Sequence, residues 1–560
     1  MAFGGALSLC NIYSGLKVGF TTNMSIAAAL LGYALFSASH RSFGTLEMGL
    51  QENAVQQTTA SAAATIAGAG LVAPIPALTM LTGRVLGYGW LVLWVLNVSV
   101  LGVIVGIALR RELIVASELA FPYGQATAEV LREMYARSRE AMVRAQVLIG
   151  SMIGAASLKL YSDMAGFVPK ALTGSFKLKS GLTVSLHNLG FALDPSLLMV
   201  GVGALIGLRA ALSVLAGAVV AWLVLAPALL STGMVEADAL DAGDAMWFEP
   251  LSRYLLWPGV SLMVCASLTS FAISSLRASR APSTAETSEP LLSGWLLRAL
   301  VGAGLLSIVL QHFLFDVPLL PALAAVALSF GLAIVAGRVT GETGIAPIGA
   351  MGKITQLVFA VISPANATTN LMAANVTGGA ASQCADMLHD LKTGHIVGAR
   401  QRDQAVAQMF GVLSGALCGS ACYLLLVPDP AAQLLTTEWP APAVAQWKAV
   451  AEVFSAGVSQ LPPFALSAAA VAGLFGSALA LTEQLVSPGR RRYLPSATSM
   501  GLAFVLPAYF ALSVAAGGVI AAFWTQRRGG AGARLVFAIA SGIIAGESLA
   551  GIFGTLARMR

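Results

Sequence analysis

Long apolar stretches recur along the whole chain and are separated by short polar connections. A helix needs about 20 apolar residues to cross the ~30 Å hydrocarbon core of a bilayer. Stretches that approach or exceed this length lie at 88–107, 197–230, 257–273, 295–314, 321–336, 405–427, 464–481 and 535–553. With the shorter and more polar candidates, the pattern predicts an all-α polytopic membrane protein of about 14–16 transmembrane helices.

The composition agrees with this fold class. Of the 560 residues, 57% are apolar and 10% are charged, which leaves too little polar surface to solvate a soluble domain. The net charge of +6 comes from basic residues in short connections and not from a nucleic-acid interface. By the positive-inside tendency, these connections face the cytoplasm. Their basic residues are Arg132, Arg137, Arg139, Arg144, Arg277, Arg280, Arg400, Arg402, Arg490, Arg491 and Arg492. The five cysteines show no metal-binding spacing, so we expect no bound metal and no disulfide framework.

The chain contains an internal duplication. ALSVLAGAVVAW, from Ala211, reappears as ALSVAAGGVIAA, from Ala511, with eight of twelve positions identical. TAEVLREM at 127–134 aligns without gaps on CADMLHDL at 384–391, so that Glu129 corresponds to Asp386. The predicted organisation is an N-terminal half at 1–275, a polar linker at 276–291 and a homologous C-terminal half at 292–560. Duplicated halves around a central site are a common transporter plan, although a channel or a scaffold could also be duplicated.

The segment 52–61 (ENAVQQTTAS) carries many hydrogen-bonding side chains directly before an apolar run. A helix places Glu52 and Gln56 on one face, with Asn53 and Gln57 beside them. These four residues are candidates for binding a polar substrate in a water-filled cavity. The alternative is an amphipathic helix at the membrane surface.

The segment 121–129 (FPYGQATAE) places a proline and a glycine at the start of a helix. Helix breaks are tolerated at membrane depth where the backbone lines a cavity, and the free N–H groups of a helix start attract anions. We therefore add Pro122, Gly124 and Thr127 to the substrate-binding candidates, and Glu129 to the candidates for proton coupling. An ordinary helix start at the membrane surface would look the same.

The segment 381–395 (ASQCADMLHDLKTGH) concentrates ionisable residues in a chain that has few. Asp386 and Asp390 are four residues apart, so a helix places both carboxylates on one face. Charges within a membrane are costly and mark functional sites by default. The candidates for proton coupling or charge pairing are therefore Asp386, Asp390 and Lys392, together with Glu547 in the apolar span 541–549. For Glu547, an ion pair with Arg209 or Arg338 is the alternative. A polar helix end at the surface would explain the first three equally well.

Two further segments predict interruptions of helices. The segment 341–353 (GETGIAPIGAMGK) has four glycines and a proline, and 364–379 (PANATTNLMAANVTGG) is rich in Asn and Thr. The first does not match the phosphate-binding pattern GxxxxGK[ST], because Ile354 follows the lysine. Both are better explained as broken or re-entrant segments around a central cavity than as a nucleotide site.

The chain resembles the oligopeptide transporter family, which includes the yellow stripe-like metal–chelate transporters. The blocks that carry the resemblance are GLKVGF, ENAVQQTTASAA, FPYGQATAEVL, VGVGALIGLRAALSVLAG, ADMLHDLKTG and SGIIAGESL, in that order, from Gly15 to Leu549. The resemblance implies a proton-coupled symporter of small peptides or metal–nicotianamine-type chelates without ATPase activity. Tyr123 stands where many members carry a smaller residue, which changes the local pocket.

Together, these patterns predict a secondary active transporter and not an enzyme, since neither HExxH nor GxSxG occurs in the chain. A passive channel for a small polar solute is the alternative. We expect no cofactor and no nucleic acid; the expected partners are a small-molecule substrate, protons and the lipid bilayer, and a homodimer is compatible with the pattern. The compact length and Ala/Gly-rich composition favour a prokaryotic inner (plasma) membrane.

Overall fold

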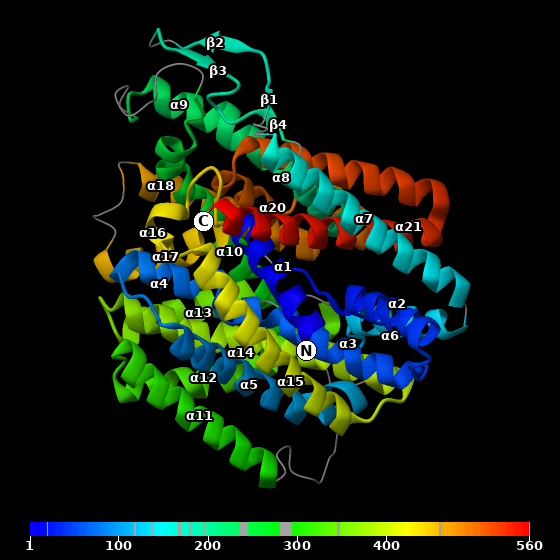
Figure 1. Cartoon of the computed structure of the whole chain (residues 1–560). Coiled ribbons are helices and arrows are strands. Elements are labelled where there is room, and N and C mark those ends of the chain that lie inside the picture. Colours follow the sequence, from blue (N-terminus) through cyan, green and yellow to red (C-terminus); the bar gives the residue numbers. More distant parts are fainter. Residues whose placement is uncertain are drawn as a thin grey trace.

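The computed structural model consists almost entirely of helices, which pack side by side into one bundle (Figure 1). It describes residues 1–19, 21–116, 119–136, 138–165, 170–178, 181–194, 196–235, 245–280, 294–343, 346, 348–457, 462 and 464–558. Most of the predicted linker, 281–291, lies outside these residues.

In the described residues up to 280, the chain forms ten α-helices with short 3-10 and π segments between them. They are α1 (Ala2–Val18), α2 (Ser25–Phe43), α3 (Leu50–Thr65), η1 (Ile66–Ala69), α4 (Pro74–Thr82), α5 (Tyr88–Arg110), η2 (Arg111–Ala116), α6 (Pro122–Ala136), α7 (Ser138–Met164), α8 (Leu197–Ala218), η3 (Val219–Leu225), α9 (Ala226–Ser231) and α10 (Phe248–Arg280). Because α10 continues to Arg280, the first five residues of the predicted linker, 276–280, are helical rather than part of a flexible connection.

The C-terminal part forms the remaining helices. They are α11 (Gly294–Phe315), α12 (Leu319–Thr343), α13 (Ile348–Ile362), α14 (Ala367–Val397), α15 (Gln401–Leu426), α16 (Pro430–Gln433), α17 (Pro442–Ala456), α18 (Ala465–Leu485), α19 (Pro488–Arg491), α20 (Ala497–Leu502), η6 (Ala503–Val505) and α21 (Ala508–Arg558). Helix α12 ends at Thr343 and α13 begins at Ile348, which agrees with the interruption predicted in 341–353. The interruption predicted in 364–379 is mostly wrong, because only its first three residues precede α14 and 367–379 is continuous helix.

Among the described residues, eleven helical segments are long and apolar enough to cross a membrane. This confirms the polytopic all-α fold, with fewer full spans than the 14–16 expected from the sequence. Several of the described helices are too short, among them α1 with 17 residues and α13 with 15. A third, α14, has 31 residues but carries the polar cluster described below.

A small β-structure caps one end of the bundle, between α7 and α8 (Figure 1). Strand β1 (Lys170–Ala171) pairs antiparallel with β4 (Ala192–Leu193), and β2 (Ser175–Lys177) pairs antiparallel with β3 (Thr183–Ser185). The strands have only two or three residues each, and the hydropathy pattern of the chain did not predict them.

The two predicted halves do not form separate bodies, because each contributes helices to the packing of the other. From the N-terminal half, α8 packs along α21 of the C-terminal half, and α5 packs along α14. Glycines permit the first contact: a Cβ added to Gly203 would lie 1.9 Å from the carbonyl oxygen of Val514, and one added to Gly517 would lie 2.0 Å from that of Val200. Such small residues allow backbones to approach closely in lipid. The homology of the halves remains a prediction.

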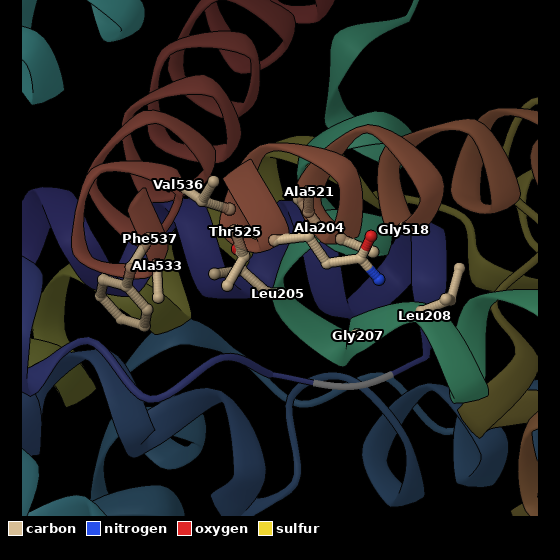
Figure 2. A pocket seen from close by; sticks show the side chains of 12 residues that line it. Ala204, Leu205, Gly207, Leu208, Gly518, Ala521, Thr525, Ala533, Val536 and Phe537 are labelled. Carbon is tan, nitrogen blue, oxygen red and sulfur yellow. The ribbon is translucent and has the colours of Figure 1, made fainter. Parts of the chain in front are cut away.

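Both α8 and α21 are broken at a glycine in a left-handed conformation, Gly207 (φ 82°) and Gly529 (φ 60°). A pocket of about 370 Å³ opens beside these breaks, lined mainly by small and apolar side chains of the two helices (Figure 2). It lies away from the acidic residues of α14, so it is not the predicted polar cavity.

Candidate functional site

Helix α14 is the most enclosed helix of the fold, although its sequence is among the most polar. It begins after Asn366, whose side chain accepts a hydrogen bond from the backbone N–H of Thr369, and ends at Gly398 in the left-handed conformation (φ 80°). Nearly every residue from Thr369 to Gly394 is buried. A membrane helix that buries acids instead of exposing them to water requires hydrogen-bonding neighbours, and α2, α3 and α15 supply them.

Asp386 and Asp390 form the centre of this site, which we call the aspartate pair. Their exposed fractions are 5% and 0%. Asp386 accepts hydrogen bonds from Ser61 Oγ (2.8 Å) and Gln408 Nε2 (3.3 Å). Asp390 accepts from Gln57 Nε2 (2.5 Å) and, at 3.4 Å, from Ser25 Oγ. Four helices thus converge on two carboxylates one turn apart.

A second layer of hydrogen bonds holds these partners in place. The hydroxyls of Ser25 and Ser61 lie 2.9 Å apart. Gln404 donates from Nε2 to the backbone oxygen of Asp390 (2.6 Å) and to the hydroxyl of Thr58 (3.3 Å). The network therefore links both aspartates to α2, α3 and α15.

Within the described residues, the aspartate pair has no positively charged side chain beside it. In the described part of the chain, no Lys, Arg or His nitrogen lies within 4.0 Å of either carboxylate; the ion pairs lie elsewhere. Among the described residues, Asp390 Oδ2 has no hydrogen-bond partner. Two like charges one turn apart, out of water and without a cation, cannot both be ionised cheaply. A single proton on either carboxyl group would relieve the repulsion.

Of the candidates on α3, only Gln57 reaches the aspartate pair. Asn53 is fully buried and donates to the backbone oxygen of Ala29 (3.3 Å), and Gln56 packs against Gly32 on α2. Glu52 is exposed and caps the start of its helix by accepting from the backbone N–H of Gly49 (2.8 Å). The polar run is therefore mostly enclosed between helices.

The candidates on α6 pack against α14 without joining the aspartate pair. A Cβ added to Gly124 would lie 2.5 Å from the backbone oxygen of His389 and 3.0 Å from the Cβ of Lys392. The side chain of Lys392 is itself buried. The hydroxyl of Thr127 bonds within its own helix, to the oxygen of Tyr123 (2.8 Å). Pro122 and Glu129 are exposed. Glu129, which the repeat aligns with Asp386, is thus exposed where Asp386 is buried.

Glu547 is buried but serves a different part of the fold. Its carboxylate accepts hydrogen bonds from Ser196 Oγ (2.5 Å) and from the backbone N–H of Leu198 (2.7 Å), at the first turn of α8. A carboxylate at a helix N-terminus satisfies free N–H groups and interacts favourably with the helix dipole. The suggested ion pair with Arg209 is wrong, because Arg209 binds Glu483 (2.9 Å).

We expect Glu547→Ala to destabilise the protein without uncoupling transport. It would leave the Leu198 N–H and Ser196 hydroxyl unsatisfied, at a cost of about 1–3 kcal/mol. The melting temperature in detergent should fall, while gradient-driven uptake per folded molecule should be preserved. Loss of coupling in well-folded protein would return Glu547 to the proton-coupling candidates.

Sequence reasoning missed five side chains of this site, namely Ser25, Thr58, Ser61, Gln404 and Gln408. Thr58 and Ser61 lie in the polar run 52–61 but were not among its four candidates. Gln404 and Gln408 are four residues apart on the apolar helix α15, so their shared face could have been recognised from the spacing. Ser25 gave no comparable signal, because a single serine at a helix start is usually only a cap.

Comparisons with known proteins agree with this architecture. The family model described as "OPT oligopeptide transporter protein" matches residues 1–558. This chain belongs to the OPT oligopeptide transporter family. The assignment covers nearly the whole chain, from α1 through α21, so the aspartate pair is part of the family's transmembrane body rather than of an added domain.

Individual relatives within the family are distant but match over most of their length. A candidate oligopeptide transporter of Saccharomyces cerevisiae is 24% identical over 99% of this chain and 94% of its own. A metal-nicotianamine transporter of Oryza sativa is 25% identical over 95% of this chain and 87% of its own. A candidate oligopeptide transporter of Haemophilus influenzae is 26% identical over 72% of this chain and 68% of its own. All three are named as transporters, not as enzymes.

Proposed function

We propose that this OPT-family protein is a proton-coupled symporter that carries small peptides or metal chelates of the nicotianamine type. The observation that carries the proposal is the aspartate pair, buried in the helix bundle with no cation within 4.0 Å in the described part of the chain. The names of the relatives supply the two substrate classes.

The aspartate pair has the properties that a proton carrier needs. Its hydrogen-bond donors, Ser61, Gln57 and Gln408, stabilise one negative charge. The second carboxyl group is then the place for a transported proton, because its ionisation would be opposed by the first. Proton binding and release would thus change the charge at the centre of α14.

The solute is expected to contact polar atoms near this pair. Gln56 Oε1 and Gln57 Oε1 are buried and have no hydrogen-bond partner in the described structure. Unsatisfied acceptors in the interior are costly and indicate a missing donor. The N–H groups of a peptide or of an amino-acid-derived chelator would supply it while the solute passes the aspartate pair.

A passive pore is the alternative, and the enclosure of α14 argues against it. Asp386, Asp390 and their partners are almost inaccessible to solvent, whereas a permanently open pore would expose its lining. We therefore favour a transporter that opens to each side in turn, in the plasma membrane of a prokaryote, and a homodimer is compatible with this mechanism.

The proposal predicts solute accumulation driven by a proton gradient. In proteoliposomes whose outside is about one pH unit more acidic than the lumen, one proton per solute should give up to about tenfold accumulation, since one pH unit corresponds to ~1.4 kcal/mol. Uptake from a mixed pool of dipeptides and nickel–nicotianamine, read by mass spectrometry, measures this. Equal uptake with and without the gradient would instead support the passive pore.

A further inference from the structure

A second buried polar cluster lies where α13 and α17 pack against the N-terminal part of α14. The hydroxyls of Thr355 and Thr377 are 2.7 Å apart and join α13 to α14. Asn370 donates from Nδ2 to the backbone oxygen of Gln356 (2.7 Å), and Gln356 donates from Nε2 to that of Trp447 on α17 (3.2 Å). The segments 341–353 and 364–379, which the sequence analysis singled out, both contribute to this cluster.

Lys353 places a basic side chain inside this cluster. Its exposed fraction is 2%, and its Nζ lies 4.5 Å from the ring centroid of Trp447. Among the described residues, Nζ has no hydrogen-bond partner and no carboxylate within 4.0 Å. A cation–π contact offsets only part of the cost of burying an ammonium group.

The side-chain amides of Asn370 and Gln356, which belong to this cluster, use their N–H donors but not their oxygen acceptors. The NH₂ groups of Asn370 and Gln356 donate to backbone oxygens, while Asn370 Oδ1 and Gln356 Oε1 are buried and find no partner in the part of the chain that the structure describes. The cluster thus lacks an anion beside Lys353 and N–H donors beside the two amide oxygens. An amino-acid-derived solute carries both groups.

We propose that Lys353 binds a carboxylate of the transported solute, with Asn370 and Gln356 accepting hydrogen bonds from its N–H groups. This inference rests on the proposed transport function and identifies anionic, amino-acid-derived solutes as the substrate class. Gly378, which lies against the Trp447 ring, precedes Asp386 by eight residues. At 1.5 Å per residue this separates the Lys353 cluster from the aspartate pair by about 12 Å along α14. Solute carboxylate and transported proton therefore have separate sites.

The test measures how strongly the protein prefers a carboxylate to a carboxamide. The labelled probe is whichever of dialanine and nickel–nicotianamine the wild type accumulates in proteoliposomes, and the competitors are that compound and its carboxamide form. We expect the carboxylate form to compete better in the wild type. Lys353→Met should reduce this preference by about 10- to 100-fold, the usual strength of one charged hydrogen bond. Lys353→Arg should retain most of it.

The matched control is Lys448→Met, on the residue after Trp447, whose ammonium group pairs with Glu452 (2.5 Å) instead of pointing into the cluster. It should leave the preference unchanged. Lys353→Met removes an unpaired buried charge, so it should not lower the melting temperature. If this variant is not recovered as folded protein, Lys353→Gln replaces it.

The outcomes separate the two proposals. Full retention of the carboxylate preference in Lys353→Met, with uptake intact, would overturn the role of Lys353 and leave the transport function standing. Failure of the wild type to accumulate either probe would remove the transport function and the Lys353 inference together.

Discussion

Asp390→Asn is expected to abolish gradient-driven accumulation of solute while exchange of solute across the membrane continues. Asparagine has the shape of aspartate and can still accept from Gln57, whose Nε2 lies 2.5 Å from the Asp390 carboxylate. It cannot take up or release a proton, and it removes the charge that opposes ionisation of Asp386. Accumulation under a gradient of about one pH unit should fall from about tenfold to the equilibrium ratio of one.

Asp403→Asn is the matched control, because Asp403 is an exposed aspartate on the first turn of the neighbouring helix α15. It should accumulate solute as the wild type does. Folding of both variants is checked by their melting temperatures. If well-folded Asp390→Asn still accumulates solute in proportion to the gradient, the proton site lies elsewhere, and Asp386→Asn is the next variant to measure.

The largest effect on stability is expected at the contact between α8 and α21. Gly203→Ala would place a methyl group 1.9 Å from the carbonyl oxygen of Val514 and 2.7 Å from its carbonyl carbon. The obstacle is backbone, so no side-chain rotation can relieve it and the helices must separate. We expect a loss of at least about 2–3 kcal/mol, seen as a lower yield of monodisperse protein and a lower melting temperature.

Gly302→Ala on α11 provides the control for that substitution. Gly302 is exposed, and a Cβ added to it would meet nothing within 4 Å. Alanine has the higher helix propensity, so this variant should be as stable as the wild type or slightly more stable. Equal stability of the two variants would contradict the close contact between α8 and α21.

The fold class could be predicted from the sequence because lipid imposes a strong and local rule. Each span must be apolar over about 20 residues, and stretches such as 88–107 and 405–427 obey it. The polar helix α14 departs from the rule, since its acids are tolerated through contacts with Ser25, Ser61 and Gln408 on other helices. The spacing of polar residues within one helix does not show which distant helix lies opposite them.

The candidate site was predicted in part for the same reason. The spacing of Asp386 and Asp390 indicated a shared helix face, and both aspartates lie in one buried cluster. Spacing alone did not reveal that Glu129 is exposed, or that Glu547 caps α8, because both depend on which helix lies opposite. For Lys353, the sequence indicated a broken segment but not the ring of Trp447, which lies 94 positions later in the chain.

The most direct test of the account is whether solute brings protons with it. Proteoliposomes containing a pH-sensitive dye, with no initial pH gradient, are given an inward gradient of the solute found in the uptake screen. The account predicts acidification of the lumen by the wild-type protein and none by Asp390→Asn, although both take up the solute. Solute entry without acidification in the wild type would contradict proton-coupled symport.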